Sequence, residues 1–341
     1  MKRLLACLLL LSILLTGCAG QPKPELKRYS ATYLTLFDTV TTIVGFAESE
    51  EAFREIVQPI HDEMLQMHQL FDIYNDYPGI VNLKTVNEKA AQQPVQVDHR
   101  IMALLEDCKV FYEATGGKVN VAMGSVLVLW HEARNDGIND PANAYLPDQD
   151  ALQSAAAHVS FEDVILDKEN MTVFFADPDI RLDVGAIAKG WAAQQACRNA
   201  PSGLLVSVGG NVCATGPKDE KGTAWVVGVQ DPDGGDSFVH TLNVTTECVV
   251  TSGDYQRAYV VDGELYHHII DPDTLYPSRY WRSVSIVCKD SGVGDMLSTA
   301  LFVLPLEEGQ KLLELYGAEA LWVDAAGEKF YSPGFENYIR T

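Results

Sequence analysis

The stretch Gly294-Asp295-Met296-Leu297-Ser298-Thr299-Ala300 follows shortly after Tyr266-His267-His268-Ile269-Ile270-Asp271-Pro272, and both carry polar residues that a packed core would not select. In a helix, Asp295 and Thr299 are four residues apart, so their oxygens point to one side. A carboxylate and a hydroxyl presented together in the first turn of a helix suit a hard cation such as Mg²⁺. His268 and Asp271, from the preceding strand, would supply proton transfer beside it. This arrangement predicts metal-assisted phosphoryl chemistry.

Each of these residues also has a purely structural explanation. An acidic residue in the first turn of a helix is stabilising with no metal present, which would account for Asp295 as a helix cap. On an alternating strand, the adjacent rings of His267 and His268 point to opposite faces, and either ring can be a satisfied structural histidine. Asp271-Pro272 forms a turn in any protein.

A second polar stretch, Leu182-Asp183-Val184-Gly185-Ala186-Ile187-Ala188-Lys189-Gly190-Trp191, passes from a strand into a helix. Its small residues let backbone approach a ligand, and the start of a helix directs amide groups at an anion. Lys189 is able to hold a phosphate as a point charge. The GxxxxGK[ST] spacing of a P-loop is absent, so this stretch alone is a weak indication of phosphate binding.

Two further turns follow strands. Ser207-Val208-Gly209-Gly210-Asn211 reads as a simple turn or bulge. In Thr251-Ser252-Gly253-Asp254-Tyr255, the hydroxyls of Thr251 and Ser252 either donate to a phosphate or shape the turn, and the sequence leaves both interpretations open.

The N-terminus has the pattern of an export signal. Lys2 and Arg3 precede an apolar run from Leu4 to Leu15, which is too short for a permanent transmembrane anchor. The run ends in Leu15-Thr16-Gly17-Cys18, which resembles a bacterial lipobox. We expect a signal peptide at 1–17, lipid attachment at Cys18, a linker at 18–30, and a mature protein tethered to the outer face of the cytoplasmic membrane. An uncleaved anchor is the alternative.

Composition narrows the possible partners. The formal net charge is −22, from 47 acidic and 25 basic residues. Nucleic acid is an unlikely partner for such a chain, because duplex binding depends on a basic surface. An acidic enzyme that acts on a phosphate ester needs a cation to offset repulsion, in agreement with a metal site.

Seven cysteines are present, of which Cys7 and Cys18 belong to the export signal. The remaining five form no CxxC pair and no ligand-like spacing, and each lies in an apolar pattern. We interpret them as small core residues and expect no zinc site.

The rest of the chain mixes strands and helices. Helical spacing is seen at 50–71, 101–112, 125–133, 147–158, 186–199, 295–303 and 307–316, with a surface loop expected at 135–145. Strand patterns occur at 33–46, 164–166, 173–176, 204–208, 225–230, 238–244, 249–251, 258–261 and 284–288. Without regular βαβ alternation, this order favours an α+β fold. We expect one large domain at 31–341.

Five motifs in order then resemble the ApbE family of FAD:protein FMN transferases. They are Asp183-Val-Gly-Ala-Ile-Ala-Lys-Gly, Val208-Gly-Gly-Asn, Thr251-Ser-Gly-Asp-Tyr, His268-Ile-Ile-Asp-Pro-Asp-Thr with Tyr276-Pro277, and Asp295-Met-Leu-Ser-Thr-Ala-Leu-Phe. The resemblance runs from about Phe37 to the C-terminus. It implies an ApbE-like mixed fold and Mg²⁺-dependent cleavage of FAD. FMN would be attached through its phosphate to a threonine of an acceptor flavoprotein, and AMP would be released.

The resemblance also implies roles for individual residues. Asp183 and Lys189 match positions that contact FAD, and Ala186 matches one whose carbonyl binds Mg²⁺ beside the Asp295 and Thr299 side chains. His268 matches a histidine implicated in catalysis, and Ile269 next to it is expected to contact the flavin nucleotide. Tyr74 resembles the aromatic residue that stacks on the flavin, and Phe37 stands near the flavin where many members have methionine.

The sequence departs from the family pattern at two positions of the site. Asn120 stands where an acid is expected, so that the resemblance places an amide at this cofactor-binding position. Gly292 falls where some members supply another acidic metal ligand, so water or substrate would complete the coordination.

Two other functions use the same residues: an Mg²⁺-dependent FAD pyrophosphatase, with water as nucleophile, and a lipid-anchored FAD-binding protein without turnover.

Overall fold

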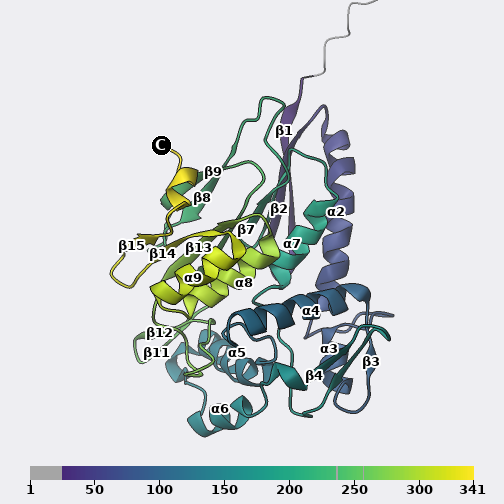
Figure 1. The fold of residues 1–341 in the computed structure, drawn as a ribbon, viewed down its shortest axis with the longest axis vertical. Helices are drawn as coiled ribbons and strands as arrows, with labels where there is room; N and C mark the ends of the chain where they lie inside the picture. The colour runs from purple at the N-terminus through teal and green to yellow at the C-terminus, as the bar shows by residue number, and fades with distance from the viewer. Residues whose placement is uncertain (1–24, 236, 256) are drawn as a thin grey trace, which may run out of the picture.

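The central layer is an eight-stranded sheet in the order β1-β2-β6-β7-β10-β13-β14-β15, with every neighbouring pair antiparallel (Figure 1). The computed structural model describes residues 25–235, 237–255 and 257–341. The strands of this sheet are β1 (Lys27–Leu36), β2 (Thr39–Ala47), β6 (Leu205–Val208), β7 (Asn211–Ala214), β10 (Cys248–Gly253), β13 (Ser283–Cys288), β14 (Glu319–Val323) and β15 (Lys329–Tyr331).

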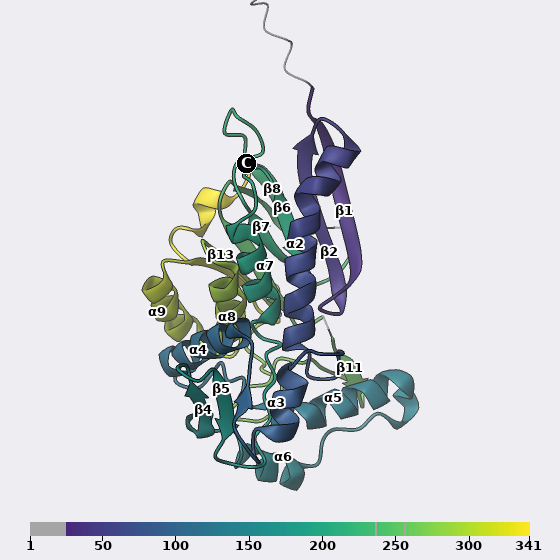
Figure 2. The ribbon, with the colours of Figure 1, turned by 90° about the vertical axis from the view of Figure 1, so that its right-hand side faces the viewer.

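Helices cover one face of this sheet. They are α2 (Glu50–Phe71), α7 (Ala188–Arg198), α8 (Ser291–Phe302) and α9 (Leu306–Tyr316). Figure 2 shows α2, α7 and α8 side by side over the strands. The apolar residues of α2 recur every three or four positions, as in Phe53, Val57, Ile60 and Met64, and all four are buried. All six residues of β13 are buried because this strand lies inside the sheet and is covered on both faces.

The opposite face carries a smaller layer. The hairpin of β8 (Trp225–Gln230) and β9 (Phe238–Val244) covers it together with the short helix η3 (Phe335–Tyr338). Their inward residues Trp225, Val229 and Leu242 form a second apolar cluster with Val249 and Leu321 of the main sheet. This coverage explains why the central strands are apolar on both sides.

The remaining elements form the lower part of the molecule in Figures 1 and 2. They are α3 (Leu83–Lys89), α4 (His99–Ala114), α5 (Gly124–Asn139), α6 (Gln149–Ala156), a three-stranded sheet of β3 (Val95–Gln96), β5 (Thr172–Phe175) and β4 (Val164–Asp167), and the hairpin of β11 (Tyr259–Val261) and β12 (Glu264–Tyr266). Two 3₁₀ turns, η1 (Pro141–Asn143) and η2 (Phe161–Asp163), lie in the same part.

The predicted α+β fold is confirmed, whereas several local predictions differ from the structure. The single strand predicted at 33–46 is two strands, because Phe37 and Asp38 turn the chain with φ values of 53° and 51°. The first strand begins at Lys27, inside the stretch 18–30 that we expected to be a linker. Helix α5 continues to Asn139 through the predicted loop at 135–145.

Gly137 explains the longer α5. A Cβ at this position would lie 2.6 Å from the Tyr259 ring, so a larger residue would push β11 away from α5. The glycine that favours a loop in the sequence is therefore a close-packing residue within a helix.

The expected signal peptide at 1–17 and the lipid-attachment residue Cys18 lie outside the described residues. Within 25–235, 237–255 and 257–341, no helix has the length and apolar character needed to cross a bilayer.

Candidate active site

A cavity of about 310 Å³ is lined both by residues of the main sheet and its helices, such as Thr251, Lys189 and Asp295, and by residues of the lower part of the molecule, such as Leu127 and His131 of α5. All the predicted site residues except Asp271 line it: Phe37, Tyr74, Asn120, Asp183, Ala186, Lys189, Thr251, Ser252, His268, Ile269, Asp295 and Thr299. They come from segments spread over most of the chain, and the fold gathers them at one place. This size is within the usual range for small-molecule sites.

Asp295 is held at the seam between α7 and α8. Its side chain is buried, and its Oδ2 accepts a hydrogen bond of 2.8 Å from the backbone N–H of Gly190. Burial raises the pKa of this carboxyl group, and the nearby Lys189 opposes the rise. A buried carboxylate with a raised pKa has too little positive charge around it, which makes it a suitable place for a cation.

Asp295 is not the cap of its helix. Helix α8 begins at Ser291, and Asp290 is its N-cap, with Oδ1 accepting from the N–H groups of Gly292 and Val293 at 2.8 and 3.2 Å. Asp295 therefore lies in the second turn, one turn later than we predicted. The structural explanation of Asp295 as a helix cap is wrong.

The other two predicted metal ligands present neutral oxygens to the same cavity. The Thr299 hydroxyl donates to the Asp295 carbonyl at 3.3 Å, which leaves its lone pairs available. Ala186 lies in the turn before α7, among the lining residues. Carboxylate, hydroxyl and carbonyl oxygens are the ligands that Mg²⁺ prefers, so the residues present fit this metal.

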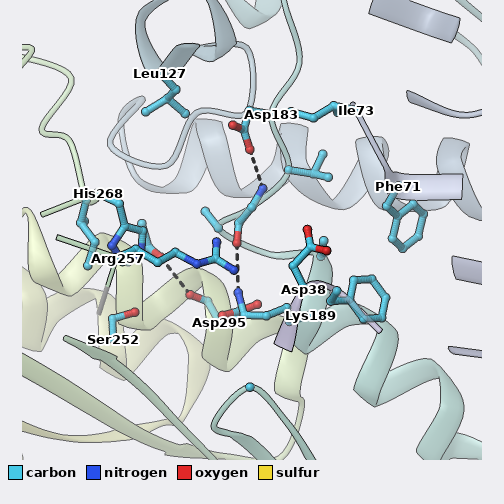
Figure 3. Close-up of a pocket in the computed structure, with 18 of the residues that line it drawn as sticks. Asp38, Phe71, Ile73, Leu127, Asp183, Lys189, Ser252, Arg257, His268 and Asp295 are labelled. Carbon is cyan, nitrogen blue, oxygen red and sulfur yellow. Dashed lines mark hydrogen bonds between the residues drawn. The ribbon is translucent and has the colours of Figure 1, made fainter. Parts of the chain in front are cut away.

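The turn from 183 to 190 has a defined internal structure. Asp183 Oδ1 accepts from the Gly185 N–H at 2.9 Å, and the Lys189 ammonium donates to the Gly185 carbonyl at 3.2 Å (Figure 3). Gly190 lies inside α7, where a Cβ would meet the Ser291 carbonyl oxygen at 2.3 Å and Asp295 Cβ at 2.5 Å. This glycine allows α7 and α8 to approach each other.

His268 has a polar atom without a protein partner. Its Nδ1 is buried and neither accepts nor donates a hydrogen bond. Burial, followed by the charges of Arg257 and Lys189, lowers the pKa of His268 to about 3. The ring is therefore neutral near pH 7 in the ligand-free protein.

The neighbouring His267 is the structural histidine of the pair. Its Nε2 donates to the Ser278 carbonyl at 2.8 Å, and its Nδ1 accepts from the Ile269 N–H at 3.2 Å. One ring is thus satisfied in the core and the other lies at the cavity, although both residues follow the end of β12 at Tyr266 and are not on the alternating strand that the sequence predicted.

Asp271 does not have the position that we predicted for a proton-transfer group. Its Oδ1 forms an ion pair of 2.9 Å with Lys118 and accepts from the Asp273 N–H at 3.1 Å. Lys118 lines the cavity, whereas Asp271 lies behind it. We therefore assign Asp271 to the positioning of Lys118 and of the turn that follows His268.

Asn120 and the two hydroxyl residues of β10 are engaged by the protein. Asn120 donates to the Val159 carbonyl at 2.7 Å and accepts from the Ala122 N–H at 2.9 Å. Thr251 bonds to Ser285, and Ser252 bonds to Ser298, each at 2.8 Å. These side chains shape the cavity wall, and all three line the cavity, so both interpretations of Thr251 and Ser252 stay predictions.

Two aromatic residues lie at the cavity. Tyr74 is 60% exposed, and its hydroxyl lies 3.1 Å from His131 Nδ1. Phe37 is buried against His68, whose Nδ1 accepts from the Phe37 N–H at 3.1 Å. One ring is therefore open to a ligand, and the other belongs to the cavity floor.

Sequence reasoning missed the arginines of the site. Arg134 and Arg257 both line the cavity, and Figure 3 shows Arg257 reaching across it from the side of His268 toward Lys189 and Asp295. His131 and Arg134 are three residues apart on α5, a spacing that places them on one side of a helix. That spacing was a usable signal of two basic side chains on one side of a helix. Nothing in the sequence indicated that Arg257, whose backbone has φ 48°, would line the cavity.

Comparisons with known proteins agree with this geometry. The family model described as the ApbE family matches residues 37–322. The chain is 38% identical over 260 residues to an FAD:protein FMN transferase of Treponema pallidum, covering 71% of this chain and 70% of that protein. It is 31% identical over 265 residues to one of Klebsiella pneumoniae, covering 73% and 78% of the two chains.

Solved structures share the fold. The crystal structure of the ApbE protein of Thermotoga maritima matches with a TM-score of 0.80 at 30% identity, covering 92% of this chain and 100% of that one. The flavin transferase ApbE of Vibrio cholerae matches with a TM-score of 0.75 at 19% identity, covering 92% and 100%. With the family model, the relatives and the cavity in agreement, the chain belongs to the ApbE family.

Proposed function

We propose that this ApbE-family flavin transferase cleaves FAD with the help of Mg²⁺ and attaches FMN through its phosphate to a threonine of an acceptor flavoprotein, releasing AMP. The names of the relatives from Treponema pallidum and Klebsiella pneumoniae support the transfer of FMN from FAD to protein. The observation that carries the finer proposal is one cavity lined by Ala186, Asp295 and Thr299 together with His268, whose Nδ1 has no protein partner.

The charges of the cavity suit the diphosphate of FAD. Lys189, Arg134 and Arg257 line it from three separate elements, and Lys118 lies at its edge. Among the described residues, Lys118 is the only one of these four cations that forms ion pairs with carboxylates within 4.0 Å. Lys189, Arg134 and Arg257 form none with the part of the chain that the structure describes. Positive charge without a protein counter-ion is the arrangement that an anionic substrate neutralises.

Ala186, Asp295 and Thr299 are the residues that would hold Mg²⁺. When bound, the metal would neutralise the charge that develops on the phosphate oxygens during transfer. Gly190 fixes one oxygen of Asp295 through the 2.8 Å hydrogen bond, so the carboxylate is oriented before any ligand arrives.

His268 is suited to accept the proton of the attacking threonine hydroxyl. Its neutral ring carries one unprotonated nitrogen, and its Nδ1 is free of protein partners. The attack joins the threonine oxygen to the FMN phosphorus and breaks the bond from that phosphorus to the bridging oxygen, which leaves with AMP.

We also propose that the protein works at the outer face of the cytoplasmic membrane, anchored by lipid at Cys18. The lipobox-like Leu15-Thr16-Gly17-Cys18 supports this location. Metabolic labelling with a radioactive fatty acid tests it, and a Cys18→Ala variant that still incorporates label would contradict it.

One experiment tests the catalytic proposal. The mature protein is incubated with FAD, Mg²⁺ and a candidate acceptor, and the acceptor is weighed by mass spectrometry while AMP is measured by chromatography. An acceptor whose target threonine is replaced by valine is the matched control. We expect the FMN adduct and AMP in equal amounts, and neither product with chelator present. Free FMN without adduct would indicate a pyrophosphatase, and intact FAD would indicate a binding protein.

A further inference from the structure

Four of the five cysteines in the described residues lie close together where α7 and α8 pack on the main sheet. Cys213 of β7, Cys248 of β10 and Cys288 of β13 are register partners across three adjacent strands. Cys197, from the last turn of α7, lies against Cys213. The sequence spacing hides this grouping, because the four residues come from four different elements.

The pair Cys213 and Cys248 has the geometry that favours a covalent link. Their Sγ atoms are 3.3 Å apart. The next pair along these strands is joined by the Ala214 N–H, which donates to the Glu247 carbonyl at 3.2 Å. Hydrogen-bonded and non-hydrogen-bonded pairs alternate in an antiparallel ladder, so the two cysteines occupy a non-hydrogen-bonded pair, where side chains are closest. Such pairs have a typical Cα separation of about 4.5 Å, which lies within the range that disulfides use.

The other two cysteines have different surroundings. The Cys288 thiol donates to the Asp290 carbonyl at 3.0 Å and is thereby directed toward the start of α8. Cys213 and Cys248 are only 2% and 3% exposed, whereas Cys197 is partly exposed. Cys197 is therefore the first sulfur of the group that a reagent from solvent meets.

Cys213 is the central sulfur of the group, with Cys248 and Cys197 on either side of it. The thiols of Cys197 and Cys248 both donate hydrogen bonds toward Cys213, and they lower its pKa against the opposing effect of burial. Thiolate character is what thiol–disulfide exchange requires.

The arrangement does not favour a thiolate-bound metal. Among the described residues, ligand atoms from three or more His, Cys, Asp or Glu side chains come within 4.8 Å of one another only at His158, Asp177 and Asp179. The sulfurs around Cys213 thus form a row and do not close around a common centre, as a tetrahedral zinc site requires.

We propose that Cys213 and Cys248 are a modification site at which a low-molecular-weight disulfide produces a cross-strand disulfide bond, with Cys197 as the entry point. The Cys197 thiolate attacks the reagent, breaks its S–S bond and releases one reagent thiol. Cys197 is now joined to the other half of the reagent by a mixed disulfide. Cys213 attacks Cys197 Sγ, forms the Cys197–Cys213 disulfide and releases that half as the second reagent thiol. Cys248 then attacks Cys213 Sγ, forms the Cys213–Cys248 disulfide and releases Cys197 as a thiol. In total the two cysteines lose two electrons and two protons, and the reagent becomes two thiols.

Peptide mapping of the whole protein tests this proposal. The reduced protein is incubated with oxidised glutathione, quenched with N-ethylmaleimide and digested with trypsin without reduction. The five cysteines fall on separate tryptic peptides, 101–109, 190–198, 199–218, 222–257 and 283–289. We expect 199–218 linked to 222–257, and the link should disappear with dithiothreitol.

Variants identify the roles of the neighbours. Cys288→Ser should keep the link, whereas Cys197→Ser should slow its formation by about tenfold, because the buried pair loses its exposed partner. Thermal unfolding of each variant checks that it is folded. If a variant does not fold, the peptide map of the wild-type protein still tests the proposal. A dominant link from 199–218 to any other peptide, complete alkylation of all five cysteines after oxidation, or a metal ion that co-purifies in equal amount and protects these thiols would overturn the proposal.

Discussion

The backbone N–H of Gly190 donates a 2.8 Å hydrogen bond to Oδ2 of Asp295 across the contact between α7 and α8. The glycine both opens the space for this contact and supplies the donor. The residue proposed to bind the metal is therefore positioned by backbone, which keeps its place when side chains around it change rotamer.

Gly190→Ala should destabilise the protein and weaken activity together. A Cβ there would lie 2.3 Å from the Ser291 carbonyl oxygen and 2.5 Å from Asp295 Cβ, so the helices must separate. We expect a loss of about 1–3 kcal/mol in the free energy of unfolding, measured by urea titration. Gly309→Ala in α9 is the control, since its nearest neighbour is a movable Leu301 side-chain atom at 3.2 Å. Equal stability of Gly190→Ala and wild type would show that α7 and α8 are not in tight contact.

Asp295→Asn should raise the Mg²⁺ concentration needed for half-maximal transfer by at least about tenfold, because the charged ligand becomes neutral. Asp290→Asn in the same helix is the matched control. It changes the N-cap, so we expect at most about 1 kcal/mol of lost stability and no change in the Mg²⁺ requirement. A metal requirement that shifts equally in both variants would contradict the assignment of Asp295.

His268→Gln should bind FAD with unchanged affinity and transfer FMN about 10²–10⁴-fold more slowly, the range for loss of a general base. Because the pKa of His268 is lowered to about 3, kcat/KM of the wild type should stay flat from pH 8 down to about pH 5. Fluorescence titration of FAD and a pH–rate profile measure both effects. An acidic limb near pH 6.5 in the wild type would refute the low pKa of this group in the free enzyme.

Asp271→Asn and Lys118→Met should have similar effects, because we assign Asp271 to the positioning of Lys118 through their 2.9 Å ion pair. The double variant should then be little worse than either single variant, as a double-mutant cycle reveals. If Asp271 itself carried a proton in the reaction, Asp271→Asn would reduce kcat far more than Lys118→Met and would change the pH profile.

The stability of the ligand-free protein should decrease as pH falls below 6.5. His267 and His268 have pKa values lowered to about 4 and about 3 by burial, so the unfolded state binds more protons than the native state between these values and pH 6.5. The free energy of unfolding therefore rises with pH in this window, and each histidine accounts for about 2 kcal/mol between pH 5 and pH 7.

Urea titrations at pH 5 and pH 7 measure this dependence. His268→Gln should reduce the difference between the two pH values by about 2 kcal/mol, whereas His99→Gln, at a side chain that is 78% exposed, should leave it unchanged. An unchanged difference in His268→Gln would mean that this ring is protonated in the native state.

Much of the fold was readable from local patterns. The helical spacing at 50–71, 101–112 and 147–158 predicted α2, α4 and α6 close to their observed positions, because each of these elements buries one continuous face. Gly137 misled the prediction of a loop, because a glycine is needed at this position for a close contact with Tyr259, which is more than a hundred residues away in the sequence. The short strands β3, β7, β12, β14 and β15 and the short helix α3 were not predicted, because segments of so few residues show no clear periodicity.

The candidate site was predictable to the extent that its residues lie in ordered motifs. The four-residue spacing of Asp295 and Thr299 predicted a shared direction, and both line the cavity. The same reasoning failed for Asp271, because whether a carboxylate faces a cavity or a lysine behind it depends on Lys118, from a distant part of the chain. The grouping of Cys197 with Cys213 was likewise invisible, since it is created by a helix resting on a sheet.

The walls of the cavity begin with Phe37 and end with Thr299, so they come from opposite ends of the folded chain. A polypeptide still leaving the ribosome has no flavin pocket until α8 has been synthesised and has joined α7. Binding of FAD must therefore follow the packing of α8 against α7, and truncated fragments that stop before residue 299 should be unable to bind the nucleotide.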